Sequence, residues 1–403
     1  MKSPPHFAIV GAAFSGNKGA EAMLVSTIIQ MQRRYPGAVI HVLSYFPSED
    51  LTLPRRKDVY IHSATPKTLV LKWLPIGILL KLLPFFKKPA VIADRLPITR
   101  LLTIDAVFDI FGVSFMDSRL KFLPFNLFSV LPFLLHQVPV FKLSQALGPF
   151  RKWPNRAFAR WTLGRMEFTA ARGAQTLAML QELPVRGSER RLIEAADIAF
   201  LLGDRSGITE VPSAQTLALI PSLVVDQKVA NYQSTLCDVA KALADAGWTI
   251  RVITHSWRSD GNGPRNHDPV VAEPIVRRLS ELGVEASLLG PGLDSEEIRA
   301  EIGKCSVVLT SRFHGLIAAL ATARPVAVVG WSHKYREVLA PFGLEEFCIP
   351  YQAFDAPSVL NLVERCESQA EEIRSKILDQ LAAAQRSARS QFDEVMRRLE
   401  ERS

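Results

Sequence analysis

Residues 305–339 read CSVVLTSRFHGLIAALATARPVAVVGWSHKYREVL, and this stretch decides the fold. The apolar run 307–309 predicts a buried strand that stops at residues 310–315, TSRFHG. A helical pattern follows as far as Ala323, and Pro325 opens a second apolar strand. Strand, helix and strand in this order predict one repeat of a parallel α/β sheet.

Ser311, Arg312 and His314 are therefore expected where a strand's carboxyl end meets a helix's amino end. Ligands of open α/β sheets bind at this edge, and a helix amino end offers N–H groups and positive potential to an anion. A fixed cation and a titratable imidazole suit a phosphate-bearing substrate and a proton transfer. The competing interpretation makes Arg312 a surface ion-pair partner and His314 a helix cap.

Composition describes a folded, basic chain that is long enough for two domains. The 403 residues are 48% hydrophobic and 22% charged, with a net charge of +8. The basic residues are dispersed, which excludes nucleic acid as the favoured partner and leaves anionic lipids or anionic small substrates. The widely spaced cysteines lack any CxxC, so they indicate a reducing compartment and predict neither a zinc site nor a disulfide framework.

Two series of alternating strand and helix patterns predict the fold class. It is α/β, with two Rossmann-like domains facing across a cleft: an amino-terminal domain over residues 1–205 and a carboxyl-terminal domain over residues 215–365. A long helix is expected over residues 366–403. Its apolar residues recur at steps of three and four, which fits a coiled coil or a helix packed back on the body.

Two apolar segments, residues 69–86 and 122–141, are poor spanning helices because prolines and polar residues interrupt them. They are either buried core or an interfacial patch that contacts a membrane. Lys72 and the pair Lys87 and Lys88 favour the interfacial interpretation for the first segment. The amino terminus does not resemble a signal peptide, so a cytoplasmic protein in peripheral contact with the inner face of the membrane is expected.

Two further segments are expected at the carboxyl ends of strands. Residues 14–19, FSGNKG, follow the first strand but match neither the P-loop nor the dinucleotide pattern. This loop is either a tight turn that needs glycine or part of an anion site. His255 and Arg258 follow a strand over residues 249–254 and are expected to face the cleft, the alternative for His255 being a structural hydrogen bond.

Four segments, in this order, resemble the polysaccharide pyruvyl transferase family. Residues 17–22, NKGAEA, are similar to its amino-terminal loop. Residues 145–149, QALGP, and 197–200, DIAF, resemble its Gln-Ser-x-Gly-Pro and Asp-Pro-Ala-Phe segments. Residues 311–315, SRFHG, resemble its carboxyl-terminal signature.

Two segments depart from the family's pattern. Residues 109–113, DIFGV, stand where the family often has a Gly-Gly turn, and residues 171–176, ARGAQT, replace its Ala-Arg-Glu-x-x-Ser segment. Both departures bear on the acceptor side more than on the donor side.

The resemblance implies a glycosyltransferase-B-like architecture and phosphoenolpyruvate as the donor substrate, with no further cofactor. It implies a glycan or lipid-linked sugar as acceptor, whose hydroxyl pair receives a pyruvate ketal. Arg312 is then the anion clamp and His314 the acid/base, both catalytic. The other predicted substrate-binding residues are Ser311, Asn17, Lys18, Gly19, Gln145, His255, Arg258, Lys334 and Arg336. No metal-ligand cluster is visible in the sequence.

Two other functions stay open at this point. A nucleotide-sugar-dependent glycosyltransferase could share the fold, but it needs a carboxylate for the donor ribose, for which Glu337 is the near candidate. A non-enzymatic membrane scaffold built on the apolar segments leaves the placement of Arg312 and His314 unexplained.

Overall fold

The computed structural model describes residues 4–54, 56–82, 103–185, 192–203, 212, 214–259 and 267–402. Contacts between residues divide the chain into two compact units, each with its own sheet. Unit 1 comprises Met1–Phe14, Met23–Ile198 and Ser387–Ser403, and unit 2 comprises Ser15–Ala22 and Ala199–Arg386.

Unit 1 is built on a sheet with the strand order β4-β3-β1-β5-β7-β8-β9, in which β6 also pairs with β7. Its described ladders are parallel, so helices must connect the strands. The strands are β1 (His6–Val10), β3 (Val39–Ser44), β4 (Val59–Ser63), β5 (Ala106–Asp109), β6 (Val113–Ser114), β7 (Val140–Leu147), β8 (Phe168–Ala171) and β9 (Leu192–Glu194). The helices are α1 (Lys18–Arg34), α2 (Pro47–Asp50), α3 (Pro66–Thr68), η1 (Leu69–Trp73), α4 (Leu74–Leu82), η4 (Asp117–Phe122), α6 (Leu123–Phe128), α7 (Leu131–Leu135), α8 (Trp153–Leu163) and α9 (Ala174–Gln181).

Unit 2 has a second parallel sheet in the order β13-β11-β10-β14-β15-β16. The chain leaves β10 toward β11 and β13, then returns to β14 on the other side, so the connection direction reverses between β10 and β14. The strands are β10 (Thr216–Ile220), β11 (Thr249–Ile253), β13 (Ala286–Leu289), β14 (Val307–Thr310), β15 (Val326–Gly330) and β16 (Cys348–Pro350). The helices are η6 (Ile198–Leu201), α10 (Leu223–Asp226), α11 (Tyr232–Asp245), α12 (Pro269–Glu281), α13 (Ser295–Gly303), α14 (Phe313–Ala321), α15 (Lys334–Leu339), η8 (Ala340–Phe342), η9 (Glu345–Phe347), η10 (Tyr351–Ala353), α16 (Ala356–Ser368) and the long α17 (Ala370–Glu400).

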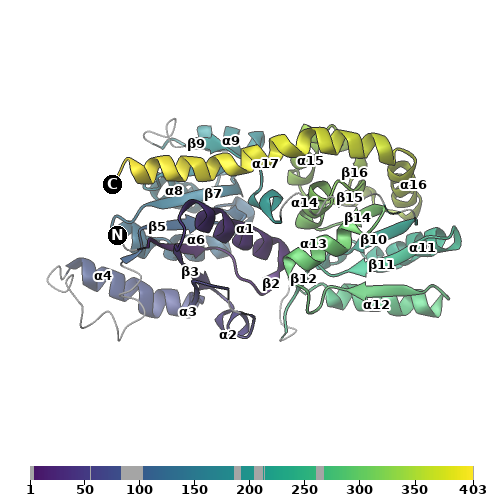
Figure 1. Ribbon diagram of the computed structural model, residues 1–403, viewed down its shortest axis with the longest axis horizontal. Coiled ribbons are helices and arrows are strands. Elements are labelled where there is room, and N and C mark those ends of the chain that lie inside the picture. Colours follow the sequence, from purple (N-terminus) through teal and green to yellow (C-terminus); the bar gives the residue numbers. More distant parts are fainter. Residues whose placement is uncertain are drawn as a thin grey trace. The chain divides into compact units, whose positions relative to one another are not determined.

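The division into units differs from the predicted domains in three places. Ser15–Ala22 joins unit 2, because β2 (Gly16–Asn17) pairs antiparallel with β12 (Ser256–Trp257). The division follows residue 198, whereas most residues between the predicted limits of 205 and 215 lie outside the described part. Helix α17, yellow in Figure 1, contributes residues to both units instead of forming a separate element.

The apolar stripe of α17 packs on the body of the protein. Ile373 and Ile377 are buried in the first half of the helix, and Phe392 and Val395 are buried in the second half. The Gln391 side chain also accepts the backbone N–H of Ser144 at 2.8 Å. These contacts explain the periodicity without a coiled coil.

The two apolar segments have different environments. In the second, Leu123, Leu127, Val130 and Phe133 are buried, so most of it is core. The first is described as far as Leu82 and carries exposed aliphatic side chains, while its last residues lie outside the described part. Within the described residues, every helix is too short or too polar to cross a bilayer.

Strand β7 of unit 1 buries polar side chains that need internal partners. Its eight residues are all buried, including Lys142 and Gln145. The Lys142 ammonium donates to the Asp109 carboxylate, and the Gln145 amide donates to the Asp109 backbone oxygen at 3.0 Å. Burial lowers the pKa of Lys142, and the Asp109 charge opposes that shift. The buried ion pair therefore joins β5 to β7 through one specific contact, in addition to apolar packing.

Replacing Lys142 with methionine leaves the Asp109 carboxylate buried without its cation. We expect the free energy of unfolding to fall by about 3–5 kcal/mol, measured by urea denaturation followed by far-ultraviolet circular dichroism. The matched control is Lys241→Met, which removes an exposed ion pair with Asp245 and should cost at most about 1 kcal/mol. Equal losses in the two variants would contradict the structural role of the buried pair.

Candidate active site

The turn after β14 is fixed by hydrogen bonds before any ligand is considered. The Thr310 hydroxyl accepts the Arg312 N–H at 3.0 Å. The Tyr232 hydroxyl donates to Ser311 Oγ at 2.7 Å, and the Tyr335 hydroxyl donates to the Ser311 carbonyl at 2.9 Å. Burial raises the pKa of both tyrosines, so they remain protonated donors. Ser311, a predicted substrate contact, is thus buried and bonded to both tyrosines.

This turn lies at the point where the sheet reverses its connections. The Ser311 N–H donates to the carbonyl of Ile220, the last residue of β10, at 3.1 Å. In open α/β sheets, the carboxyl ends of strands at such a reversal form the usual ligand site. The site that the sequence predicts at the β14–α14 junction therefore lies at this reversal, and it stays a prediction.

Arg312 is held in a buried ion pair. Its guanidinium donates to a carboxylate oxygen of Asp268, with the two side chains 11% and 0% exposed. The Asp268 carboxylate also accepts the N–H of Leu223 at 3.2 Å. Burial raises the pKa of Asp268, and the Arg312 charge opposes that shift. Arg312 is thus an ion-pair partner, as the competing interpretation expected, but the pair is enclosed and does not lie on the surface. It holds the guanidinium at the amino end of α14.

His314 lies in the first turn of α14 and packs against residues 14–19, at Gly19 in the first turn of α1. A Cβ placed on Gly19 would lie 2.0 Å from His314 Nδ1 and 2.1 Å from its Cγ. Real Cβ atoms do not approach other atoms so closely, so the His314 ring can occupy this position only beside a glycine. Position 19 therefore needs glycine because any larger residue would clash with the His314 ring. The tight-turn interpretation of the loop gave a different reason, the freedom of the glycine backbone.

The loop itself is tied to the end of β11. The Lys18 N–H donates to the His255 carbonyl at 3.1 Å, next to the β2–β12 ladder. Asn17 Oδ1 accepts the Gly19 N–H at 3.0 Å. The Lys18 ammonium is buried, pairs with Glu21 at 2.9 Å and lies 5.3 Å from the centroid of the Trp257 ring. The loop thus brings a cation into unit 2.

His255 is a buried imidazole among positive groups. Burial is the largest cause that lowers its pKa, to about 3, and the charges of His314, Arg312 and Lys18 lower it further. His255 is consequently neutral at neutral pH. The four basic side chains come from three separate stretches of sequence. The hydrogen bond from the Lys18 N–H to the His255 carbonyl and the contact of Gly19 with His314 bring these stretches together.

The remaining predicted residues are divided between this cluster and other positions. Lys334 lies 4.7 Å from the centroid of the Phe313 ring, beside the β14–α14 turn. Arg258 directly follows β12, and its N–H donates to His267 Nδ1 at 3.3 Å. Arg336 is exposed and donates to the Cys348 carbonyl at 3.4 Å. A substrate contact from Arg336 stays a prediction.

Gln145 belongs to unit 1, where it has a structural position. Its side chain is 0% exposed, accepts a hydrogen bond from Ser114 Oγ at 2.7 Å and donates to Asp109 and Leu143. A direct substrate contact from Gln145 stays a prediction.

Asp268 and the two tyrosines are the residues that sequence reasoning missed. Asp268 precedes Pro269, a pattern typical of a helix N-cap, and it does occupy that position in α12. Its side chain makes no capping hydrogen bond and instead pairs with Arg312. The sequence offered no signal for Tyr232 or Tyr335, because nothing local distinguishes them from core aromatic residues.

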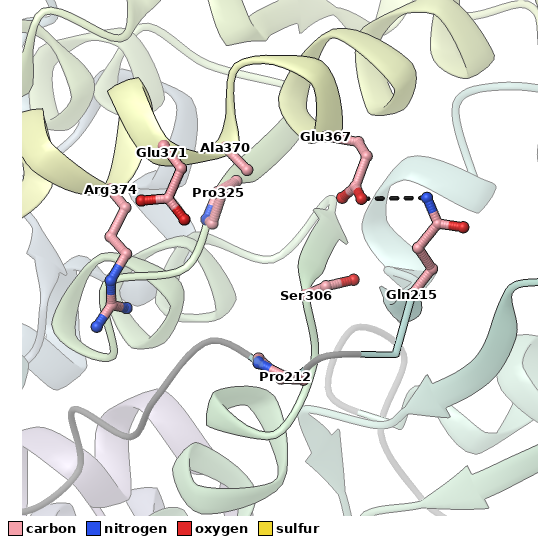
Figure 2. Close-up of a pocket in the computed structure, with 8 residues that line it drawn as sticks. All are labelled: Pro212, Gln215, Ser306, Pro325, Glu367, Ala370, Glu371 and Arg374. Atoms are coloured by element: carbon pink, nitrogen blue, oxygen red, sulfur yellow. Dashed lines mark hydrogen bonds between the residues drawn. The ribbon is translucent and has the colours of Figure 1, made fainter.

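Unit 2 also has a pocket of about 190 Å³ at the opposite edge of its sheet (Figure 2). It is lined by Pro212, Gln215, Ser306, Pro325, Glu367, Ala370, Glu371 and Arg374. Gln215, Ser306 and Pro325 precede β10, β14 and β15, so they mark the amino ends of these strands. The pocket is therefore separate from the basic cluster, and its two carboxylates do not favour an anion. Among the described residues, no group of three or more His, Cys, Asp or Glu side chains is arranged to hold a metal.

Comparison with known proteins gives the same picture at the level of family and fold. A model of the family described as polysaccharide pyruvyl transferase matches residues 17–333. The amylovoran biosynthesis protein AmsJ of Erwinia amylovora is 21% identical over 401 residues, covering 92% of this chain and 94% of that protein.

Solved structures of glycosyltransferase-B type share the two-unit α/β fold. A glycosyltransferase of Rickettsia africae superposes with a TM-score of 0.59 at 11% identity, covering 100% of both chains. A UDP-GlcNAc 2-epimerase of Neisseria meningitidis superposes with a TM-score of 0.57 at 13% identity, covering 93% of this chain and 94% of that one. At such low identity these likenesses establish the fold alone, which is glycosyltransferase-B-like as expected.

The depressed pKa of His255 predicts a specific loss of stability in acid. Below its ordinary pKa of 6.5, the unfolded chain binds a proton at His255 that the folded chain excludes down to about pH 3. The free energy of unfolding therefore falls as pH decreases through this window, by up to about 1.4 kcal/mol per pH unit. Between pH 7 and 5, the wild type should lose about 2 kcal/mol more than His255→Gln in urea denaturation. The variant His333→Gln, at an exposed histidine, should lose as much free energy of unfolding as the wild type over this range. If His255→Gln also lost as much, the low pKa of His255 would be contradicted.

Proposed function

The chain belongs to the polysaccharide pyruvyl transferase family, and from that premise we propose that it transfers the pyruvyl group of phosphoenolpyruvate to two hydroxyls of a sugar. The product is a cyclic pyruvate ketal on a polysaccharide or lipid-linked glycan, together with inorganic phosphate. The relative in amylovoran biosynthesis supports a polysaccharide as the destination. The donor and the ketal are part of the proposal.

The convergence of Lys18, His255, Arg312 and His314 is the observation that carries the proposal. Phosphoenolpyruvate carries a carboxylate and a phosphate, and a cluster of cations at a helix amino end suits both. Lys18 and Arg312 each pair with one carboxylate, Glu21 and Asp268, which hold them in place. The site is largely buried, so its charges act with little screening by solvent. A site built in this way selects a small anion.

The proposed reaction balances without an oxidant or a reductant. A proton adds to C3 of phosphoenolpyruvate, which becomes a methyl group, and C2 acquires oxocarbenium character. One sugar hydroxyl forms a C–O bond to C2 and gives up its proton. The second hydroxyl then bonds to C2 and loses its proton as the C2–O bond to phosphate breaks. Of the two protons released, one replaces the proton consumed at C3 and the other leaves with phosphate.

Each residue of the cluster has a role that its geometry allows. Arg312, held at one side by Asp268, binds the carboxylate or the phosphate as a fixed fork. His314 exchanges the proton with C3 or with a sugar hydroxyl. Lys18 and Lys334 neutralise phosphate charge, and the neutral His255 offers a hydrogen bond without adding a further cation to the cluster. We propose no resident metal or organic cofactor.

The setting follows from the acceptor. Lipid-linked glycans are assembled at a membrane surface, so we propose a cytoplasmic protein in peripheral contact with the inner face of the membrane. The exposed aliphatic side chains of α4 support this contact. A nucleotide-sugar donor is the alternative outcome of the donor test described next.

Phosphoenolpyruvate should raise the melting temperature, because a ligand that binds the folded state stabilises it by mass action. At a concentration about 100 times its dissociation constant, the gain is about 2.7 kcal/mol, visible as a shift of a few degrees in differential scanning fluorimetry. A shift with one nucleotide sugar and none with phosphoenolpyruvate would replace the proposed donor.

Arg312 variants locate the donor within the site. Arg312→Lys keeps a charge near Asp268 but loses the planar guanidinium. We expect it to weaken the binding of phosphoenolpyruvate at least about tenfold. The pair Arg312→Ala with Asp268→Asn removes the clamp without leaving a buried carboxylate unpaired. Arg278→Ala, an exposed arginine paired with Glu281, is the matched control and should bind like the wild type. Equal affinity in all of these proteins would exclude Arg312 as the clamp.

Two variants should disable the same imidazole by different means. His314→Gln removes the acid/base, and Gly19→Ala forces the His314 ring out of its position. Both should lower turnover by about 10² to 10⁴ while the thermal shift with phosphoenolpyruvate persists. Turnover is measured as phosphate release with depyruvylated polysaccharide as acceptor, and the ketal methyl group is followed by proton nuclear magnetic resonance.

A glycine outside the site provides the control for stability. Gly343 has a φ of +64° and open space where a Cβ would lie, so Gly343→Ala costs backbone strain of about 1 kcal/mol without touching His314. We expect near wild-type turnover from it. If Gly19→Ala turned over as fast as Gly343→Ala, the contact with His314 would have no role in the reaction.

A further inference from the structure

The helical segment η1 and α4 in unit 1 shows an exposed aliphatic face. Leu71 and Leu82 are 72% and 70% exposed, and Val70, Ile78 and Leu79 are also exposed. Soluble proteins tolerate single exposed leucines, but a contiguous set along one helical segment marks an interaction surface. We call these five residues the aliphatic face.

The opposite side of the segment is already packed, so the aliphatic face is not a displaced core. Leu69 and Trp73 are buried, and the Trp73 indole N–H donates to the Ser63 carbonyl at 3.2 Å. Gly77 lies against Pro132 of α7, where an added Cβ would be 3.3 Å from Pro132 Cβ. These inner residues recur at steps of four. The segment is anchored through one side, and the aliphatic face points outward.

The charged side chains on this part of the chain have one sign. Lys72 and Lys81 are exposed on the segment, and the exposed Lys67 precedes it in α3. Residues 59–82 contain no aspartate or glutamate. Apolar side chains with flanking lysines and no carboxylates match the interface of a bilayer that contains anionic lipids, where each nearby lysine strengthens binding about fivefold.

We propose that the aliphatic face docks on an anionic membrane surface, with its leucines at the acyl boundary and Lys67, Lys72 and Lys81 at the headgroups. The segment is too short to span a bilayer, so it lies in the plane of the interface. A protein partner of equal apolarity would need no lysines around its binding surface. The proposal rests on the membrane contact that is part of the proposed function and names the surface of unit 1 that makes it, but it does not depend on the donor chemistry.

Vesicle co-sedimentation tests the proposal. At low salt, the wild type should partition onto phosphatidylcholine vesicles that contain a quarter phosphatidylglycerol at least about tenfold more strongly than onto pure phosphatidylcholine. The variant Leu71→Glu/Leu79→Glu/Leu82→Glu should lose at least about tenfold of that binding. Lys67→Gln/Lys72→Gln/Lys81→Gln should lose about fivefold per lysine and most of its salt dependence.

The matched control replaces three exposed aliphatic residues that lie outside the aliphatic face. This variant, Leu51→Glu/Val270→Glu/Leu378→Glu, should bind vesicles like the wild type. The Leu71/Leu79/Leu82 variant should keep the wild-type thermal shift with phosphoenolpyruvate, which separates failure of docking from failure of the proposed function. Equal vesicle binding by that variant and the wild type would overturn the assignment. So would wild-type self-association in analytical ultracentrifugation that the variant abolishes without any vesicle binding, because a second copy would then be the occupant.

Discussion

The hydrogen bond from the Lys18 N–H to the His255 carbonyl is the contact on which the candidate site depends. With the short β2–β12 ladder, it attaches a loop from the start of the chain to unit 2. That attachment places Gly19 against the His314 ring and brings the Lys18 charge toward His255. Without it, the carboxyl-terminal unit would still have Arg312 and His314, but the positive cluster would be incomplete.

Burial of charge is the second constraint, and buried carboxylates meet it in both units. In unit 1, Lys142 and Asp109 neutralise each other inside the sheet, so their pair serves the fold. In unit 2, Glu21 pairs with Lys18, Asp268 pairs with Arg312, and His255 remains neutral. The two cations are thus held in fixed positions near the amino end of α14, where the proposed anionic donor needs them.

The likeness to glycosyltransferases and epimerases illustrates how far a fold can be separated from its chemistry. The same two-unit α/β architecture occurs in a glycosyltransferase and in a UDP-GlcNAc 2-epimerase at 11% and 13% identity. Function is set by the side chains that a fold presents at its site. Here that edge carries Arg312 and His314 on α14 and receives the loop from residues 16–19.

The sequence by itself determined the alternating α/β architecture, the β14–α14 junction and the family, because these depend on local periodicity and on short motifs. It placed Arg312 and His314 at a strand end, since strand and helix boundaries are local. Only the tertiary structure decided that Asp268 holds Arg312, that Gly19 touches His314 and that Gln145 is buried. Each of these contacts joins residues tens to hundreds of positions apart, and local propensity carries no information about such pairs.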